Sequence, residues 1–277
     1  MVTETSIFFM RVTLFISLIL PIVLLVVYTL KNKGKQIVSA WFLGAGGFFV
    51  LQILVRMPIL GALSLQPGFQ AFAENNYVLY VLILGFTAGL FEVIGRLAVA
   101  KIISKNLTYE RSIAAGLGHG GIEAILLIGT TYISNLLYAM MINTNTFDGM
   151  VEQAKAMGAD VTSLLTVKEA LLTTPAYLFG LSGYERLLTM ICHTAMSLLV
   201  CYFMYRKQTV KGVLISLTLH TVLDSVVGLI SGLSTPHMGN VISQNTCYVL
   251  SYVFLTLMAV VSLVIIQKVK RVFHKED

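Results

Sequence analysis

The sequence predicts an all-α, polytopic membrane protein built as a bundle of about seven transmembrane helices. Of its 277 residues, 57% are hydrophobic and only 12% are charged, whereas a soluble domain typically carries about 25% charged residues. Apolar runs of about 20 residues recur along the chain, and this is the length that an α-helix needs to cross the hydrocarbon core. A chain with so few charges cannot cover a water-facing surface, so the composition excludes a soluble globular protein.

Seven apolar segments are predicted to span the membrane. They are residues 6–30, 37–60, 78–100, 112–142, 184–205, 212–233 and 247–267. The fourth is longer than a crossing requires, so we expect it to tilt or to project beyond the lipid. The first is too long for the apolar part of a signal peptide and is not followed by a small-residue cleavage site, so we expect a retained helix. We expect residues 1–277 to form one integral-membrane domain, with a motif-bearing core at 78–235.

The Lys and Arg residues gather in alternate loops between these segments. Four such regions hold 13 of the 19 basic residues: Lys31, Lys33 and Lys35; Lys101, Lys105 and Arg111; Arg206, Lys207 and Lys211; Lys268, Lys270, Arg271 and Lys275. The positive-inside rule places these regions in the cytoplasm. The N-terminus is then outside and the C-terminus inside, which agrees with an odd number of spans. The net charge of +6 is thus explained by membrane orientation, and no nucleic-acid partner is expected.

The loop at residues 143–183 is the longest segment outside the predicted spans. Between positions 151 and 172 it mixes charged residues with Ala, Leu and Val. This pattern is typical of one or two amphipathic helices that lie on a membrane surface. Such helices can cap a cavity, or they can simply connect two spans.

Ionisable residues interrupt four of the apolar spans. They are Glu92 with Arg96, His119 with Glu123, His193 alone, and His220 with Asp224. Residues four apart share one face of a helix. Ionisable groups are costly inside a bilayer, so they tend to face the interior of a bundle and to mark a functional site.

The depth of these residues supports one shared site. At a rise of about 1.5 Å per residue, the three histidines, Glu92, Glu123 and Asp224 lie roughly 12 to 18 Å from the cytoplasmic ends of their helices. The helices run in both directions, yet the ionisable groups occupy one slab of the membrane. Unrelated polar residues would have little reason to do so.

Each residue also has a purely structural interpretation. Glu92 and Arg96 can neutralise each other as a buried ion pair. His193 can form an interhelical hydrogen bond, and His220 can bond Asp224 for the same purpose. These structural interpretations would all have to be true at once, so a single shared site is the stronger hypothesis.

Four glycines surround His119, at positions 116, 118, 120 and 121. Small residues allow two helices to approach closely. Glycines also leave room for a substrate or a metal beside the helix, so the sequence leaves both roles open.

Two chemistries suit this set of residues. In the first, His119, His193 and His220 bind zinc together with one or two carboxylates, an open position holds water, and a nearby Glu acts as general base. In the second, no metal is present, and Glu123 activates water together with a histidine. His220 with Asp224 would then polarise the substrate carbonyl.

Four segments carry a resemblance to a known family. They are FEVIGR (91–96), GLGHGGIEA (116–124), YERLLTMICH (184–193) and HTVLD (220–224). They resemble the YhfC family of bacterial intramembrane metalloproteases, which is similar to the PrsW and CPBP membrane proteases. The resemblance runs from about 78 to 235 and implies a location in the bacterial plasma membrane.

The resemblance also implies roles for individual residues. The catalytic group would comprise Glu123, Glu92, Arg96 and Asp224, and the metal ligands would be His119, His193 and His220. The related proteases often have two consecutive Glu residues in the first motif, whereas Phe91 precedes Glu92 here. This departure counts against Glu92 as the catalytic base.

We therefore predict a peptidase that hydrolyses bonds in a membrane protein substrate within or beside the lipid bilayer. The rival class is a proton- or ion-coupled transporter, because buried His, Glu and Asp residues also form proton relays. Transporters commonly show inverted repeats and broken helices, and neither is evident in the sequence. A third alternative is a non-catalytic membrane scaffold. Bound zinc would favour the metalloprotease.

Overall fold

The computed structural model describes residues 1–273, and over this range the chain is helical and contains no strand. The predicted all-α fold is therefore confirmed, as is the number of spans. Seven helical stretches are long and apolar enough to cross a membrane: Glu4–Lys31, Ile37–Ser64, Tyr77–Asn106, Tyr109–Asn143, Ala176–Tyr205, Thr209–Gly232 and Gln244–Phe273. The fifth begins earlier than predicted, because the residues before position 184 are also mostly apolar. Lys275, one of the predicted cytoplasmic residues, lies outside the described range.

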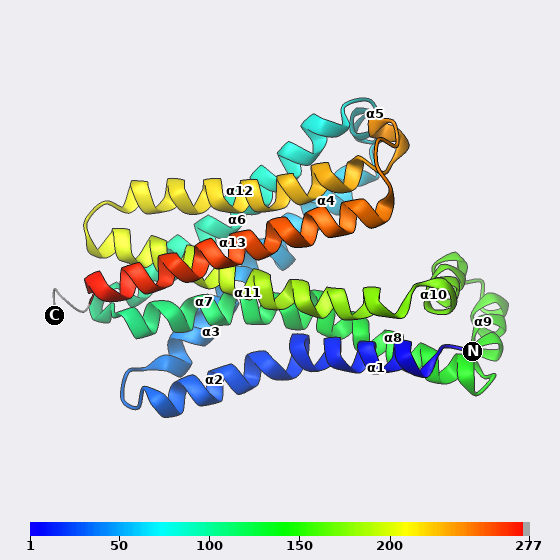
Figure 1. The fold of residues 1–277 in the computed structure, drawn as a ribbon, viewed down its shortest axis with the longest axis horizontal. Coiled ribbons are helices and arrows are strands. Elements are labelled where there is room, and N and C mark those ends of the chain that lie inside the picture. The colour runs from blue at the N-terminus through cyan, green and yellow to red at the C-terminus, as the bar shows by residue number, and fades with distance from the viewer. Residues whose placement is uncertain (274–277) are drawn as a thin grey trace. The chain divides into compact units, whose positions relative to one another are not determined.

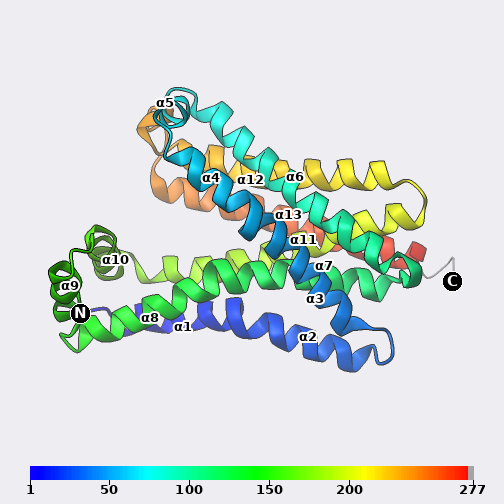
Figure 2. The same ribbon diagram turned by 180° about the vertical axis from the view of Figure 1, so that it is seen from behind.

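The chain divides into two compact units. Unit 1 comprises Met1–Val23 and Ala124–Leu187, and unit 2 comprises Leu24–Glu123 and the residues from Leu188 onward. The helices, labelled in Figures 1 and 2, are α1 (Glu4–Leu14), α2 (Leu20–Lys31), α3 (Ile37–Phe48), α4 (Met57–Ser64), α5 (Pro67–Asn75), α6 (Tyr77–Ile103), α7 (Tyr109–Glu123), α8 (Thr130–Asn143), α9 (Phe147–Ala156), α10 (Thr162–Thr173), α11 (Ala176–Tyr205), α12 (Thr209–Gly232) and α13 (Gln244–Phe273).

Short π-helical and 3-10 turns interrupt or join these helices. The π-helical turns are η1 (Phe15–Ile19), η2 (Phe49–Arg56) and η4 (Ala124–Gly129), and the 3-10 turns are η3 (Ser104–Asn106) and η5 (Pro236–Met238). A π-helical turn inserts one residue per turn and so changes which side chains face a neighbour, and such turns are frequent at functional sites. The second of them, η2, contributes two side chains to the site described below.

In unit 1, α1 packs against α8, and α8 packs against α9 and α10. Apolar side chains such as Met10 and Phe147 form its core. The helices α9 and α10 are the amphipathic pair predicted for the 143–183 loop. They bury Phe147 and Leu171 and leave Lys155 and Glu169 exposed, so this part of the predicted fold is confirmed.

In unit 2, α3 packs against both α7 and α6, and α12 packs against α6 and α13. Figures 1 and 2 both show α6 alongside α12. The central element is the part of α11 from Leu188 to Cys201, in which every residue except Ile191 is buried. The ionisable residues of the predicted site all belong to this unit.

Glycines bring α7 into very close contact with its two neighbours. A Cβ atom on Gly118 would lie 1.9 Å from the backbone oxygen of Trp41 on α3, and one on Gly116 would lie 2.6 Å from the Cα of Thr194 on α11. No side chain fits at either position, so these glycines serve close helix contact. This packing fixes where His119, which follows Gly118 directly, enters the interior of the unit.

Candidate active site

The carboxylate of Glu92, on α6, is the centre of a buried polar cluster. Only 2% of the residue is exposed. Its Oε1 atom accepts a hydrogen bond from the Nε2 atom of Gln52 at 2.8 Å, and its Oε2 atom accepts one from the Nη2 atom of Arg96 at 2.8 Å. A buried carboxylate is tolerated only when it is paired and hydrogen-bonded, and Glu92 meets both conditions.

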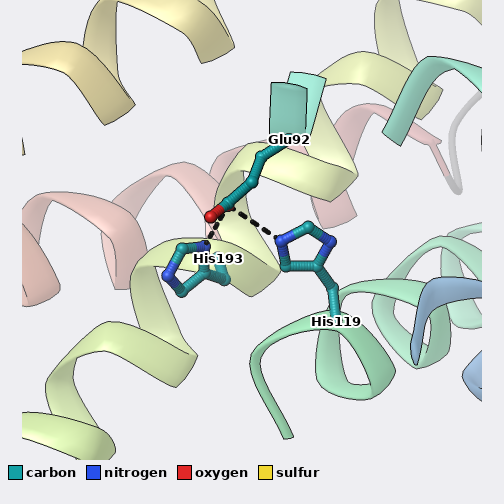
Figure 3. A group of neighbouring side chains, drawn as sticks. All are labelled: Glu92, His119 and His193. Carbon is teal, nitrogen blue, oxygen red and sulfur yellow. Dashed lines mark hydrogen bonds and ion pairs between the residues drawn. The ribbon is translucent and has the colours of Figure 1, made fainter. Parts of the chain in front are cut away.

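Three histidine nitrogens from three different helices surround the Oε2 atom of Glu92. The Nε2 atom of His119 on α7 lies 2.9 Å away, the Nδ1 atom of His193 on α11 lies 3.4 Å away, and the Nδ1 atom of His220 on α12 lies 3.3 Å away. Figure 3 shows Glu92, His119 and His193 pointing toward one another. All three histidines are buried, so this oxygen is where the helices of unit 2 direct their ionisable groups.

Two of these histidines each connect Glu92 to a further carboxylate, a different one in each case. The Nε2 atom of His193 lies 2.8 Å from the Oε2 atom of Glu123, and the Nε2 atom of His220 lies 3.2 Å from the Oδ2 atom of Asp224. The side chain of Glu123 is 11% exposed and that of Asp224 is 41% exposed, against 3% for Glu92. The cluster therefore opens toward its outer carboxylates and is closed around Glu92.

The guanidinium of Arg96 lies inside the cluster, on the same helix face as Glu92. Its Nη2 atom is 2.8 Å from the Oε2 atom of Glu92, 2.7 Å from the Nδ1 atom of His193 and 3.2 Å from the Nε2 atom of His119. One cationic nitrogen thus contacts three acceptor atoms. The predicted ion pair between Glu92 and Arg96 exists, but it is part of the larger cluster.

Glu92, His119 and His193 form a group that could hold a metal ion. Their ligand atoms all lie within 4.8 Å of one another, and carboxylate oxygen with imidazole nitrogen is a donor set that divalent metals bind. The Nε2 atom of His119 faces both a carboxylate oxygen and a guanidinium nitrogen, although one ring nitrogen cannot donate to the first and accept from the second. A cation bound at the lone pairs of all three residues removes this conflict, so the residues fit a metal.

The seven residues singled out in the sequence therefore come together in one network. His220, predicted as the third metal ligand, lies against Glu92 and Asp224 and is not part of the three-residue group that could hold a metal. Glu92, predicted as catalytic, belongs to that group instead.

Two further residues of the network, Gln52 and Arg56, were missed in the sequence. Both lie on η2, where Gln52 bonds Glu92 and the Nη1 atom of Arg56 donates to the Oε1 atom of Gln52 at 3.5 Å. The signal was present, because Gln52 and Arg56 are polar, four residues apart and inside an apolar span. The same criterion had selected Glu92 and Arg96.

Close packing of α6 against α12 brings His220 to Glu92. A Cβ atom on Gly89 would lie 3.2 Å from the Cβ of His220, and one on Gly85 would lie 2.4 Å from the Oγ of Ser225. Gly85, Gly89 and Glu92 are spaced by four and three residues, so they share one face of α6. The glycines let the two backbones approach, and Glu92 then meets the histidine directly.

A family model and a curated relative both point to the same protein family. The chain matches the YhfC intramembrane metalloprotease family over residues 16–243. It is similar to a Bacillus subtilis (strain 168) protein described as the uncharacterized membrane protein YhfC, with 33% identity over 226 residues that cover 81% of this chain and 84% of the relative. No solved structure matches the chain.

Proposed function

Because the chain belongs to the YhfC intramembrane metalloprotease family, we propose that it is an intramembrane peptidase. Its substrate would be a membrane-associated protein in which it hydrolyses a peptide bond. The observation that carries the proposal is the ring of histidine nitrogens from three helices around the buried Oε2 atom of Glu92. Histidines and carboxylates that converge in a buried site supply the groups that can bind a metal and take up a proton when water is activated.

We propose that the metal is zinc and that Glu92, His119 and His193 hold it. Bound there, zinc would act as a Lewis acid and lower the pKa of water for attack on a carbonyl. The outer carboxylate of Glu123, 2.8 Å from the second ring nitrogen of His193, would orient that imidazole, as carboxylates commonly do for metal-binding histidines.

Glu123, His220 and Asp224, which surround the metal-binding group, would transfer the proton and bind the substrate. Glu123 is the carboxylate next to the metal-binding group that is still partly exposed, so we assign it the role of general base that takes a proton from water. His220, held between Glu92 and Asp224, would donate a hydrogen bond to the oxygen of the scissile carbonyl. Asp224, facing the Nε2 atom of His220, would accept a hydrogen bond from its N–H and stabilise the imidazolium form, whose Nδ1–H then makes this hydrogen bond.

The test is the substitution Glu123→Gln, which keeps the size of the side chain and removes its basicity. A substrate must first be found, as a membrane protein that accumulates uncleaved in a deletion strain. We expect Glu123→Gln to lower cleavage of that substrate by at least about 10²-fold while the protein still inserts and purifies normally. The matched control is Glu185→Gln on α11, a carboxylate that pairs with Arg186 and should retain full activity. Full cleavage by Glu123→Gln would rule out Glu123 as the base.

We also propose an orientation, with the N-terminus outside and the C-terminus in the cytoplasm of a bacterium. It is supported by the basic residues in alternate loops. A cysteine placed at Asp160, between α9 and α10, should react with an impermeant thiol reagent added to intact cells, and one placed at Lys275 should not. The three native cysteines are buried and should give little background. The reverse labelling pattern would invert the orientation.

A proton-coupled transporter is the second candidate. It is favoured by one observation, the path of ionisable groups from the closed carboxylate of Glu92 through His220 to the partly exposed Asp224. The lumen of proteoliposomes that contain the purified protein should then acidify when a proton gradient is imposed across their membrane. Glu92→Gln should stop this proton flux. Stoichiometric zinc without proton flux would favour the peptidase.

A further inference from the structure

The position of Arg96 bears on how the site takes up its metal. The Nη2 atom of this guanidinium lies 2.7 to 3.2 Å from one acceptor atom of each of Glu92, His119 and His193, the three residues that could hold a metal. A metal bound to these atoms would lie about 2.0 to 2.2 Å from each of them. Two cations cannot share three acceptor atoms in a buried site, because their repulsion is poorly screened there.

The remaining donors of Arg96 are not used in this position. Its Nε and Nη1 atoms are buried and make no hydrogen bond among the residues that the structure describes. Buried donors normally find partners. In this inward position, the guanidinium therefore pairs with Glu92 but leaves two of its own nitrogen atoms without a hydrogen bond.

A second place for the guanidinium adjoins the first. Arg96, His119 and Ser197 line a small cavity of about 10 Å³, roughly the room for one water molecule. The hydroxyl of Ser197, on α11, is buried and has no hydrogen-bond partner within residues 1–273. The cavity has room for one nitrogen atom of the guanidinium, and a nitrogen turned into it would bring an unused donor toward an unused acceptor.

We propose that Arg96 is a built-in cation with two positions. In the metal-free protein it holds together the acceptor atoms of Glu92, His119 and His193, and metal binding rotates it so that one of its nitrogen atoms enters the adjoining cavity toward Ser197. This rests on the proposed function, since it describes how the same site is loaded. Arg96 is thus a positioning residue that lowers the affinity for metal and keeps the empty site folded.

The experiment measures zinc affinity of the full-length protein in detergent, by competition with a coloured chelator. Arg96→Met should bind Zn²⁺ at least about tenfold more tightly than the wild type, the equivalent of about 1.4 kcal/mol, because nothing has to be displaced. Ser197→Ala should bind Zn²⁺ about threefold more weakly, because the displaced guanidinium loses its partner. The control, Arg111→Met, changes another buried arginine that bonds the backbone of Asn106 and should leave the affinity unchanged.

The two variants, Arg96→Met and Ser197→Ala, distinguish displacement of the guanidinium by the metal from long-range repulsion between the two cations. Ser197→Ala changes no charge, so a weaker affinity in this variant cannot come from long-range repulsion. If Arg96→Met does not fold without metal, Arg96→Gln replaces it, and Ser197→Ala tests the outward position independently.

Equal affinity in the wild type and Arg96→Met would overturn the inference and leave the zinc site of the proposed function standing. Wild-type affinity in Ser197→Ala would overturn the outward position. Zinc binding by neither the wild type nor the arginine variant would overturn both the inference and the proposed metal.

Discussion

Unit 1 and unit 2 each bury polar groups, but they satisfy these groups differently. In unit 1, the hydroxyls of Thr13 and Tyr132 both donate to the backbone oxygen of Phe179, at 2.6 and 3.0 Å. In unit 2, the carboxylate of Glu92 is held by other side chains, among them Gln52 and Arg96. The first arrangement needs only the backbone and two neutral groups, whereas the second concentrates charge.

The difference teaches where to look for function in a membrane protein. A hydroxyl bonded to a backbone oxygen joins two helices and leaves nothing available for chemistry. A cluster of carboxylates, imidazoles and a guanidinium is costly to bury, and it is retained where the charges themselves are used. The cluster around Glu92 is of the second kind.

The largest effect is expected from removing the guanidinium of that cluster. Arg96→Ala leaves the carboxylate of Glu92 buried without its cation, which should lower the free energy of unfolding of the metal-free protein by about 3–5 kcal/mol. Thermal unfolding in detergent measures this. The double variant Glu92→Gln with Arg96→Ala should regain most of the loss. If the double variant is as unstable as Arg96→Ala, the loss does not come from an unpaired charge.

The next effect concerns the helix contact that places His119. Gly118→Ala puts a Cβ atom 1.9 Å from the backbone oxygen of Trp41, so α3 and α7 must move apart, at a cost of about 3 kcal/mol. The matched control is Gly46→Ala on α3, where a Cβ atom meets nothing within 4 Å. We expect a lower melting temperature for Gly118→Ala alone. Equal melting temperatures would show that the contact is not tight in solution.

A smaller effect is expected from the residue that orients Glu92. Gln52→Leu removes the hydrogen bond to the Oε1 atom, and a bond to a charged group contributes about 1.5–3 kcal/mol. Zinc affinity should also fall by about 10- to 100-fold, as it does when groups that orient ligands are lost. Isothermal titration with Zn²⁺ measures the second effect. Unchanged affinity would mean that Glu92 keeps its orientation without Gln52.

The smallest effect is expected in unit 1. Tyr132→Phe removes one neutral hydrogen bond to the backbone oxygen of Phe179, which should cost about 1 kcal/mol of stability and leave zinc affinity unchanged. Chemical unfolding and zinc titration of the same preparation check both points. A loss as large as that of Arg96→Ala would contradict the contrast drawn between the two units.

The sequence by itself determined the spans and seven residues of the cluster, without Gln52 and Arg56. Apolar length predicts a membrane helix because a segment must satisfy its backbone hydrogen bonds within the lipid, and all seven stretches were found this way. Depth also follows from the sequence, since the rise per residue is fixed. Polar residues at one depth, such as Glu92, His119 and His193, could therefore be assigned to one site before any packing was known.

Only the tertiary structure decided how these residues share the site. Depth does not fix the rotation of a helix about its axis or the identity of its neighbours, and both depend on close packing at glycines such as Gly89 and Gly118. Packing places the carboxylate of Glu92 at the centre and brings in Gln52 from η2. It also puts the guanidinium of Arg96 on the acceptor atoms that a metal would use, because those atoms converge only after α6, α7 and α11 have come together.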